Sequence, residues 1–307
     1  MLSILIPTYN YNIVSLVTQL HKQANEANIV FEIIVIDDAS TNLQIIEENK
    51  NEITSLSQVS YINSIKNQGR EITRQKLAKI AQFNWLLFID ADTIPKKKTF
   101  IKDYLDSIKG GSKLIFGGIA YSNNKPEDNA ILRWKYGKSR EEVSVNKRNK
   151  NRYLSINSGC FLIDKTLFIT TNSKIVWKLY GLDIFFTYLL MKYKVKVLHI
   201  NNPVYHLGLE NGKVFLEKSK KAANTLYFLE NERLISPSYS SLQKAYNKLV
   251  QYRLANLFRF CVKHFIPYIE KNLKTKNPSL FWFDVYRLYF FSTLSIDKTV
   301  YKSKKSA

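Results

Sequence analysis

Cysteine, acidic side chains and long apolar stretches are all scarce in this chain of 307 residues. Its two cysteines, Cys160 and Cys261, lie far apart, which excludes a disulfide framework and a metal site built from cysteines. We expect both to be buried as small apolar side chains. Internal repeats and low-complexity segments are also absent, so a repeat array is excluded.

No apolar stretch is long enough to cross a bilayer. The nearest candidate, "LFWFDVYRLYFFSTLSI" at 280–296, is interrupted by Asp284 and Arg287. The first residues, "MLSILIPTYN", are typical of a core strand rather than of a secretory signal. We therefore expect a cytoplasmic protein, and peripheral attachment to the inner face of the cell membrane stays open as an alternative.

Acidic residues are outnumbered by 46 Lys and Arg to 25 Asp and Glu, which gives a formal net charge of +21. Such a charge attracts anions, whether nucleic acid, acidic lipid head groups or phosphorylated substrates. A nucleic-acid-binding module is therefore an alternative function, but the sequence has no aromatic motif of the kind that stacks on bases. We expect no nucleic acid partner, and attraction to an anionic membrane surface accounts for the dispersed basic residues.

The first hundred residues alternate between strand and helix patterns. Strand-like runs are "LSILIP", "FEIIVIDDAS", "VSYINS" and "WLLFIDAD", and the segments between them have helical periodicity. One predicted helix carries an apolar face of Ile13, Leu16, Val17 and Leu20, and another carries Ile72, Leu77 and Ile80. This alternation predicts βαβ units and a mostly parallel central sheet flanked by helices.

The pattern loosens after residue 110. "KLIFGGIAY" predicts another strand, in which the pair Gly117 and Gly118 indicates a bulge or a close ligand approach. Residues 135–154 are basic, polar and poor in core residues, which predicts a mobile loop that serves as a lid or acceptor clamp. "YGLDIFFTYLLMKY" predicts a helix that opens near Asp183.

From about residue 215 the chain is predicted to be helical, basic and aromatic. "RLANLFRFCVKHF" has the spacing of an amphipathic helix. The residues of its apolar stripe are Leu254, Leu257, Phe258, Cys261, Val262 and Phe265. Two alternatives stay open: the stripe packs on a catalytic domain, or it lies on a membrane surface.

Two predicted strands end in carboxylates, Asp37-Asp38 and Asp90-x-Asp92. In open α/β sheets ligands bind outside the carboxyl ends of the strands, although such acids also cap helices. Residues two apart in an extended strand share a face, so Asp90 and Asp92 can present both carboxylates to one site. Oxygen ligands of this kind suit Mg²⁺ or Mn²⁺ beside a diphosphate.

The ordered set "LSILIPTYN", "EIIVIDDAST", "NQGREITRQKLAKIA" and "WLLFIDADTIP" resembles the family 2 nucleotide-sugar glycosyltransferases of GT-A fold. "YGLDIFFTYLL" and "HINNPVYHLGLE" extend the resemblance to about residue 210. It implies a Rossmann-like GT-A domain over 1–215, with a nucleotide-binding half at 1–110 and an acceptor half at 111–215. A basic, aromatic-rich helical extension follows at 216–307.

The resemblance also implies roles for single residues. It puts Pro7, Thr8 and Tyr9 at the nucleotide base pocket, Asp38 on the base, with Asp37 beside it, and Asp90 near the ribose. Gly69, Arg70 and Arg74 match a basic turn and helix next to the donor, where arginine suits a diphosphate. Asp92, with Asp90, matches the metal-binding pair, and His206 matches a late histidine that in some relatives reaches the metal or the diphosphate. His199 is expected in the core.

Asp183 matches the family's general base, which takes the proton of the acceptor hydroxyl in a single displacement with inversion. The family usually has Glu-Asp at this point, whereas this chain has Leu182-Asp183. The usual upstream Phe-Asp-Glu element is replaced by "SKIVWKLYG". These departures concern acceptor recognition, and a catalytically inactive homologue that acts as a binding protein stays open. Asp183 as a helix N-cap is the structural alternative.

The resemblance therefore implies a metal-dependent inverting glycosyltransferase of the hexosyltransferase class. Its donor would be a nucleotide-diphosphate sugar, taken as a UDP-sugar, and its acceptor a hydroxyl of a glycan or lipid-linked glycan precursor, as in polysaccharide biosynthesis. Mn²⁺ or Mg²⁺ is the expected cofactor. "FIDADTI" also comes close to the loop of haloacid-dehalogenase-like phosphatases, with Asp90 as nucleophile and Asp92 as general acid, although Ile94 departs from that pattern.

Overall fold

A computed structural model describes residues 1–294, which fall into two compact units. The first unit comprises Met1–Ser122, Lys138–Lys178 and Leu189–Gly208. The second comprises Asn123–Gly137, Leu179–Tyr188 and the chain from Leu209 onward. The end of the predicted C-terminal extension, residues 295–307, lies outside the described residues.

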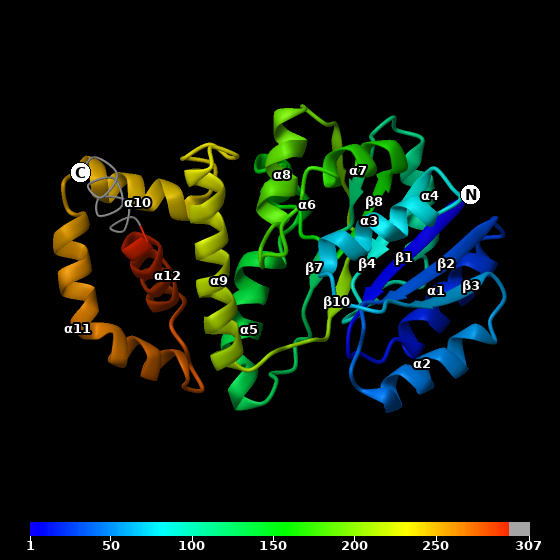
Figure 1. Cartoon of the computed structure of the whole chain (residues 1–307), viewed down its shortest axis with the longest axis horizontal. Helices are drawn as coiled ribbons and strands as arrows, with labels where there is room; N and C mark the ends of the chain where they lie inside the picture. Colours follow the sequence, from blue (N-terminus) through cyan, green and yellow to red (C-terminus); the bar gives the residue numbers. More distant parts are fainter. Residues whose placement is uncertain (295–307) are drawn as a thin grey trace. The chain divides into compact units, whose positions relative to one another are not determined.

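The first unit is built on a seven-stranded sheet in the order β3-β2-β1-β4-β8-β6-β9 (Figure 1). Strands β3, β2, β1 and β4 are parallel, β8 is antiparallel to β4 and β6, and β6 is parallel to β9. The predicted mostly parallel sheet is confirmed. The strands are β1 (Leu2–Thr8), β2 (Phe31–Asp37), β3 (Val59–Asn63), β4 (Trp85–Ile89), β6 (Leu114–Phe116), β8 (Cys160–Asp164) and β9 (Val197–His199).

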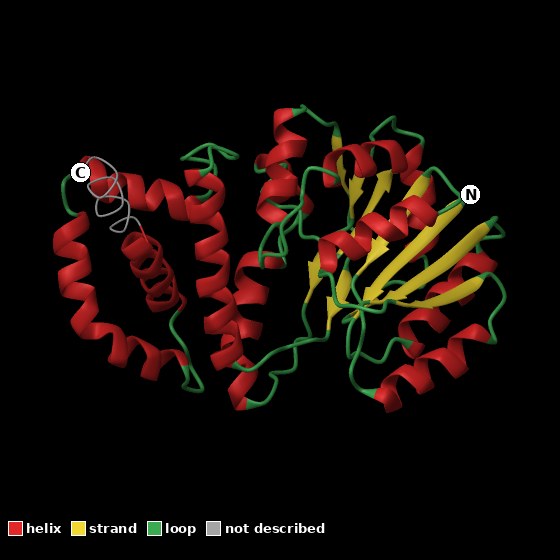
Figure 2. Cartoon of the chain, in the orientation of Figure 1, coloured by secondary structure: helices red, strands yellow, loops and turns green. Residues whose placement is uncertain are grey.

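Helices cover both faces of this sheet (Figure 2). Helix α1 packs against α2 and α4, while α3 packs against α7 on the other face. The chain moves outward from β1 to β3 through α1 and α2, and returns through α3 to β4 on the far side of β1. The strand order thus reverses between β1 and β4. The helices of this unit are α1 (Val14–Glu26), α2 (Leu43–Thr54), α3 (Arg70–Ile80), α4 (Phe100–Ile108), α6 (Val145–Lys150) and α7 (Lys165–Asn172).

The apolar faces of two helices were predicted with different success. In α1 the predicted face is correct, since Leu16, Val17 and Leu20 are all buried. In α3 Leu77 is buried, but Ile80 is 47% exposed. Thr73, Arg74 and Ala78 are buried although they were not part of the predicted face, and Arg74 is 1% exposed. An arginine can occupy a core position when its guanidinium is paired, and pairing is not visible in hydrophobic periodicity.

A second sheet of three short strands, β5 (Thr93–Pro95), β10 (Val204–His206) and β7 (Ile119–Ala120), lies in the same unit. The predicted strand at "KLIFGGIAY" is split into β6 and β7 at Gly117 and Gly118. A Cβ at Gly117 would lie 2.1 Å from the carbonyl oxygen of Asn202, and Gly118 has a φ of +104°. The glycine pair therefore allows two backbone segments to lie close together.

The predicted loop at residues 135–154 is largely helical instead. It contains the end of α5 (Ile131–Tyr136), a π-helical turn (Gly137–Glu141) and α6. Arg148 of α6 is 2% exposed and donates to the carbonyl oxygens of Phe116 (3.3 Å), Gly117 (3.2 Å) and Ile200 (2.7 Å). Backbone carbonyls satisfy this buried cation, so a polar segment acquires a core anchor that its composition does not indicate.

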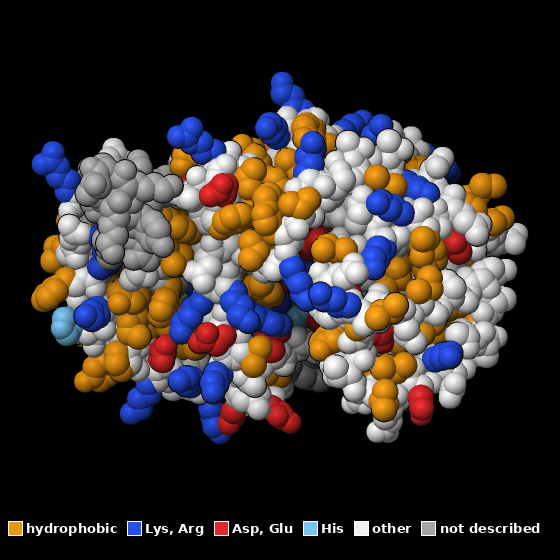
Figure 3. Space-filling view, viewed as in Figure 1, with side chains coloured by type: hydrophobic (Ala, Val, Ile, Leu, Met, Phe, Trp, Pro, Cys, Tyr) orange, Lys and Arg blue, Asp and Glu red, His pale blue; other side chains and the backbone are white. Residues whose placement is uncertain are grey.

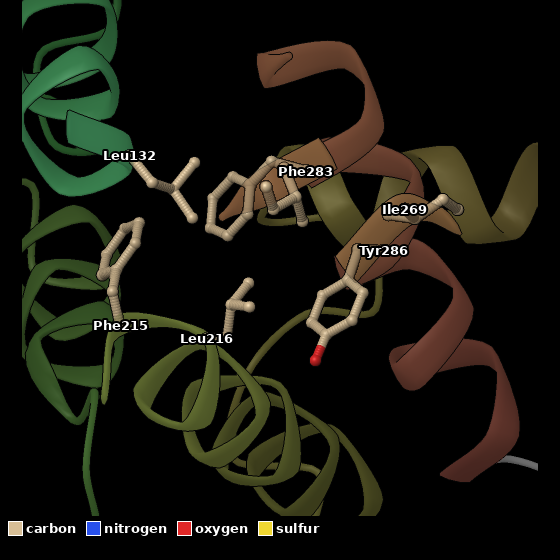
Figure 4. Packing of buried hydrophobic residues seen from close by; sticks show 7 residues of the cluster. Leu132, Phe215, Leu216, Ile269, Phe283 and Tyr286 are labelled. Carbon is tan, nitrogen blue, oxygen red and sulfur yellow. The ribbon is translucent and has the colours of Figure 1, made fainter. Parts of the chain in front are cut away.

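The second unit is helical, as predicted for the C-terminal region. Its core is a cluster of buried side chains that includes Phe215, Ile269, Phe283 and Tyr286 (Figure 4). The helices are α5, α9 (Gly212–Asn231), α10 (Ser241–Gln251), α11 (Ala255–Leu273) and α12 (Leu280–Leu294), and the boundary between the units falls within α8 (Asp183–Lys192). Within residues 1–294 no helix combines the length and hydropathy needed to span a membrane.

The predicted apolar stripe of residues 254–265 is only partly buried. Val262 packs against the cluster, whereas Leu257 is 58% exposed and Phe265 is 55% exposed. Cys160 is buried as predicted, but Cys261 is exposed and that prediction is wrong. Helix α11 carries apolar residues both on its covered side and on its exposed side, so periodicity could not identify which side α12 covers.

His199 in β9 gives the fold a testable dependence on pH. Its ring is 3% exposed, and Nε2 donates to the carbonyl oxygen of Arg152 at 2.8 Å. Burial lowers its pKa to about 4, although the bond to Arg152 works in the other direction. In the unfolded chain the pKa is about 6.5, so acidification from pH 6.5 to 4 protonates the unfolded chain first and destabilises the fold.

We predict that His199→Gln, which keeps a donor but does not titrate, removes this contribution. Between pH about 7 and about 4 the wild-type chain should lose up to about 3 kcal/mol more unfolding free energy than the variant. Urea unfolding of both proteins at several pH values measures the difference. Parallel curves would contradict the assignment of a neutral buried imidazole.

Candidate active site

The candidate site lies where β1 and β4 end, at the reversal of strand order. Strand β4 ends at Ile89 and the chain turns at once. The backbone N–H and the hydroxyl of Thr93 both donate to the carbonyl oxygen of Asp90, at 3.1 and 2.8 Å. The extended geometry expected for Asp90 and Asp92 is therefore wrong, because a turn replaces it. The two acids have different partners.

Asp90 is paired with two arginines of α3. Arg74 Nη2 lies 2.5 Å from Asp90 Oδ1, and it also donates to the carbonyl oxygen of Ser158. Arg70 Nη1 lies 3.5 Å from Asp90 Oδ2, while its Nε pairs with Glu71. The Arg74 side chain is 2% exposed, whereas that of Arg70 is 39% exposed. Arg74 is thus a buried support of Asp90, and Arg70 keeps an accessible cationic group at this edge.

Asp92 is paired with His206, with Oδ2 and Nε2 3.2 Å apart. Antiparallel pairing of β5 and β10 sets His206 opposite Thr93, and Leu207 N donates to the carbonyl oxygen of Asp92 at 2.8 Å. Burial raises the pKa of the Asp92 carboxyl, but the hydrogen bond and charge of His206 and the charge of Arg70 outweigh it and lower the pKa. Asp92 is therefore ionised at neutral pH.

The chain closes tightly over Asp92. A Cβ at Gly208 would lie 2.4 Å from Asp92 Oδ2, so this position needs glycine. Within residues 1–294 no group of three or more His, Cys, Asp and Glu side chains is arranged to hold a metal. One carboxylate oxygen and one imidazole nitrogen nevertheless fit a Mn²⁺ or Mg²⁺ whose other positions are taken by phosphate oxygens and water.

The acids after β2 organise the neighbouring loops. Both oxygens of Asp38 accept backbone N–H groups, from Gln68 at 2.9 Å and from Gly69 at 2.8 Å. Asp37, which is 1% exposed, accepts the backbone N–H of Ser40 at 2.7 Å and the hydroxyl of Tyr61 at 2.6 Å. These bonds fix the loop that leads into α3 at Gly69, whose φ is +89°.

The loop after β1 carries an exposed aromatic side chain. Pro7 and Thr8 are buried, and Tyr9 is 49% exposed. Asn10, with a φ of +49°, accepts the backbone N–H groups of Thr41 and Asn42 and so ties this loop to the one after β2. Asn10 was not predicted, although asparagine tolerates left-handed geometry better than most residues.

Three further residues near His206 were also not predicted. The ring of Tyr121 lies 5.5 Å from that of His206, measured between centroids. The Tyr121 hydroxyl donates to Glu141, and its backbone N–H donates to Glu142 at 3.2 Å. The sequence feature that could have pointed to Glu141 and Glu142 is a pair of consecutive acids within a strongly basic stretch.

The structure thus brings Arg70, Arg74, Asp90, Asp92 and His206 together in the first unit. Asp183, the predicted general base, belongs to the second unit, where it lies in the first turn of α8. Leu182 just before it is buried.

The strand order and the reversal between β1 and β4 put the first unit in the class of doubly wound α/β folds, whose ligands bind at this edge. Comparison with protein families identifies the family of the chain. The family model described as glycosyl transferase family 2 matches residues 3–169, so the chain belongs to this family and is a glycosyltransferase.

The chain is also similar to several solved structures. The chain is similar to mannosyl-3-phosphoglycerate synthase from Rubrobacter xylanophilus, with 14% identity, a TM-score of 0.50, and coverage of 77% of this chain and 76% of that one. A complex of glucosyl-3-phosphoglycerate synthase from Mycobacterium tuberculosis with Mg²⁺ and UDP gives 14% identity, a TM-score of 0.49, and coverage of 74% and 78%. S. aureus TarS 1-349 gives 20% identity, a TM-score of 0.45, and coverage of 73% and 64%.

One curated relative, an uncharacterized glycosyltransferase of Haemophilus influenzae, is 32% identical over 94 residues. The match covers 30% of this chain and 29% of that relative. It agrees with the family and defines no substrate.

The two arginines provide a matched pair of substitutions. Arg74→Met leaves Asp90 without its buried partner, so we predict a loss of about 3–5 kcal/mol of unfolding free energy. Arg70→Met breaks a half-exposed pair and should cost no more than about 1 kcal/mol. Urea unfolding of the two variants beside the wild-type chain tests the difference. Equal losses would show that the two arginines do not have the separate roles described.

Proposed function

We propose that this glycosyltransferase moves a sugar from a nucleotide-diphosphate sugar, a UDP-sugar, to a hydroxyl of a glycan or glycan precursor. The observation that carries the proposal is the convergence of Asp92, His206 and Arg70 beside Asp90 where β4 ends. A carboxylate, an imidazole nitrogen and an accessible guanidinium are the groups that a metal-bound diphosphate needs. The hexosyl donor follows from the family resemblance.

Asp92 and His206 would hold the Mn²⁺ or Mg²⁺ ion. When bound, the ion neutralises charge on the diphosphate leaving group. Arg70 is placed to bind a diphosphate oxygen, because its side chain is accessible and lies next to Asp90. Asp90, held by Arg74, is assigned to the ribose side of the donor, and the glycine at position 208 keeps the chain close to Asp92.

The nucleotide base is assigned to the loops after β1 and β2. Tyr9 is the exposed aromatic group there, with Pro7 and Thr8 as its backbone support. A carboxylate offers about four lone-pair positions, so Asp38 can accept a bond from the base while it holds Gln68 and Gly69. Asp37 acts on the pocket through Tyr61 and Ser40.

Asp183 is proposed as the general base. The acceptor hydroxyl must lose its proton while it attacks the anomeric carbon from the side opposite the diphosphate, and a carboxylate within hydrogen-bond distance can take that proton. The product then has the inverted anomeric configuration. With Leu182 in place of an acid, Asp183 acts without the neighbouring carboxylate that the family usually carries.

The phosphatase alternative is less well supported. It requires Asp90 to act as a nucleophile, yet Asp90 pairs with Arg74 at 2.5 Å and with Arg70 at 3.5 Å. These two arginines hold the Asp90 carboxylate in place, which disfavours its attack on a phosphoryl group. Family membership over residues 3–169 points to sugar transfer as well. Trapping with beryllofluoride should therefore leave Asp90 unmodified.

A screen of nucleotide sugars with Mn²⁺ or Mg²⁺, which measures release of the nucleoside diphosphate, tests the proposed donor chemistry. Asp92→Asn should lower the rate at least about 100-fold, because even changes behind a metal ligand often cost 10–100-fold. Asp106→Asn, at an acid whose side chain is 62% exposed, is the matched control and should retain full activity. Release that survives Asp92→Asn, or that persists in chelator, would refute the metal-dependent mechanism.

The role of Asp183 is separable from donor binding. Asp183→Asn should reduce transfer about 10²–10⁴-fold, the range for loss of a general base, while the affinity for UDP with Mn²⁺ stays unchanged. Asp284→Asn, at a half-exposed acid of the same unit, serves as control. Turnover and calorimetric UDP titration together decide the question. Unimpaired transfer by the Asp183 variant would assign the base elsewhere.

A further inference from the structure

Helix α11 exposes a row of large apolar side chains. Its inner side packs on the core of the second unit through Ile269 and Leu273, which are 2% and 1% exposed. The residues that lie on the outer side at i, i+3, i+8 and i+11 are Leu257, Phe260, Phe265 and Tyr268, which are 58%, 68%, 55% and 72% exposed. Tyr252 and Leu254, just before the helix, are also exposed.

Basic side chains accompany this row. Residues 241–274 contain seven Lys and Arg but only one acid, Glu270, and Lys274 lies 3.9 Å from it. Lys263 and Lys271 are exposed on α11 itself. Figure 3 shows hydrophobic side chains at the surface over this helix, with Lys and Arg beside them. We call the exposed residues 252–271 of this region the α11 surface.

Charge decides which partner suits the α11 surface. The cores of protein–protein interfaces are depleted in lysine, and a purely apolar partner would leave these cations without counter-charges. A bilayer with anionic head groups offers both an apolar layer for the aromatic side chains and negative charge for the lysines. Phenylalanine, leucine and tyrosine beside lysine and arginine are the residues of helices that lie in the plane of a membrane interface.

We propose that the α11 surface binds the anionic face of a lipid bilayer, with the axis of the helix parallel to the membrane plane. Leu257, Phe260 and Tyr268 enter the head-group region, and Lys263 and Lys271 remain at the level of the lipid phosphates. The inference does not depend on the proposed function, because it uses no residue of the candidate active site. It gives the enzyme access to acceptors that are themselves held in a membrane.

The test is co-sedimentation of the full chain with vesicles of phosphatidylcholine alone and of phosphatidylcholine mixed with phosphatidylglycerol. We expect binding to the mixed vesicles only, weakened by added salt. Phe260→Ser with Tyr268→Ser should reduce the affinity at least about tenfold, through lost apolar burial. Lys263→Glu with Lys271→Glu should do the same, since each basic residue contributes about fivefold.

Matched controls come from the first unit. Val30→Ser with Leu43→Ser removes two apolar side chains that are 59% and 73% exposed, and Lys50→Glu reverses an exposed charge. Neither should change vesicle binding, and all variants should keep the wild-type circular dichroism. Equal binding of the α11 variants and controls, binding to neutral vesicles alone, or no binding at all would overturn the proposal. A dimer in sedimentation velocity that the α11 variants dissociate would assign the surface to a second copy instead.

Discussion

The candidate site depends on a short antiparallel contact, the pairing of Thr93–Pro95 in β5 with Val204–His206 in β10. It joins two chain segments that are far apart in sequence and fixes His206 opposite Thr93. Asp92, one residue earlier, then lies 3.2 Å from the His206 ring, with its backbone carbonyl held by Leu207. A one-residue shift in this register would turn His206 to the other side of the sheet. Glycine at position 208 lets the chain pass over Asp92 without a clash.

The charged groups at this edge of the sheet have different roles. Arg74 is buried and pairs with Asp90 at the end of a core strand. Arg70 lies one helical turn earlier and keeps an accessible guanidinium. Both carboxylate oxygens of Asp38 accept bonds from the loop that precedes α3, and Arg70 is the first residue of that helix. The buried charges therefore hold the exposed ones in position, which is how a rigid sheet edge can present charge to an anionic ligand.

Much of the fold could be predicted from the alternation of strand and helix patterns, and the buried face of α1 followed from its periodicity. Acids at the ends of β2 and β4 predicted the edge at which the candidate site lies. Periodicity failed where polar groups are buried through pairing, as with Arg74 in α3 and Arg148 in α6. Periodicity also failed in α11, where apolar residues lie on both the covered and the exposed side. Cys261 of this helix is exposed. The contact of Tyr121 with Glu141 joins residues 20 positions apart, and two consecutive acids in a basic stretch do not indicate which partner they bind.

We propose that Asp92 and His206 together hold the metal that accompanies the donor diphosphate. Electron paramagnetic resonance of Mn²⁺ bound to the chain in the presence of UDP tests it most directly, since the sequence has only 4 histidines and ¹⁵N-histidine labelling makes their coupling visible. The account predicts a coupling to one imidazole nitrogen that disappears in His206→Asn and persists in His199→Gln. No nitrogen coupling in the wild-type chain, or a coupling unchanged by His206→Asn, would contradict it.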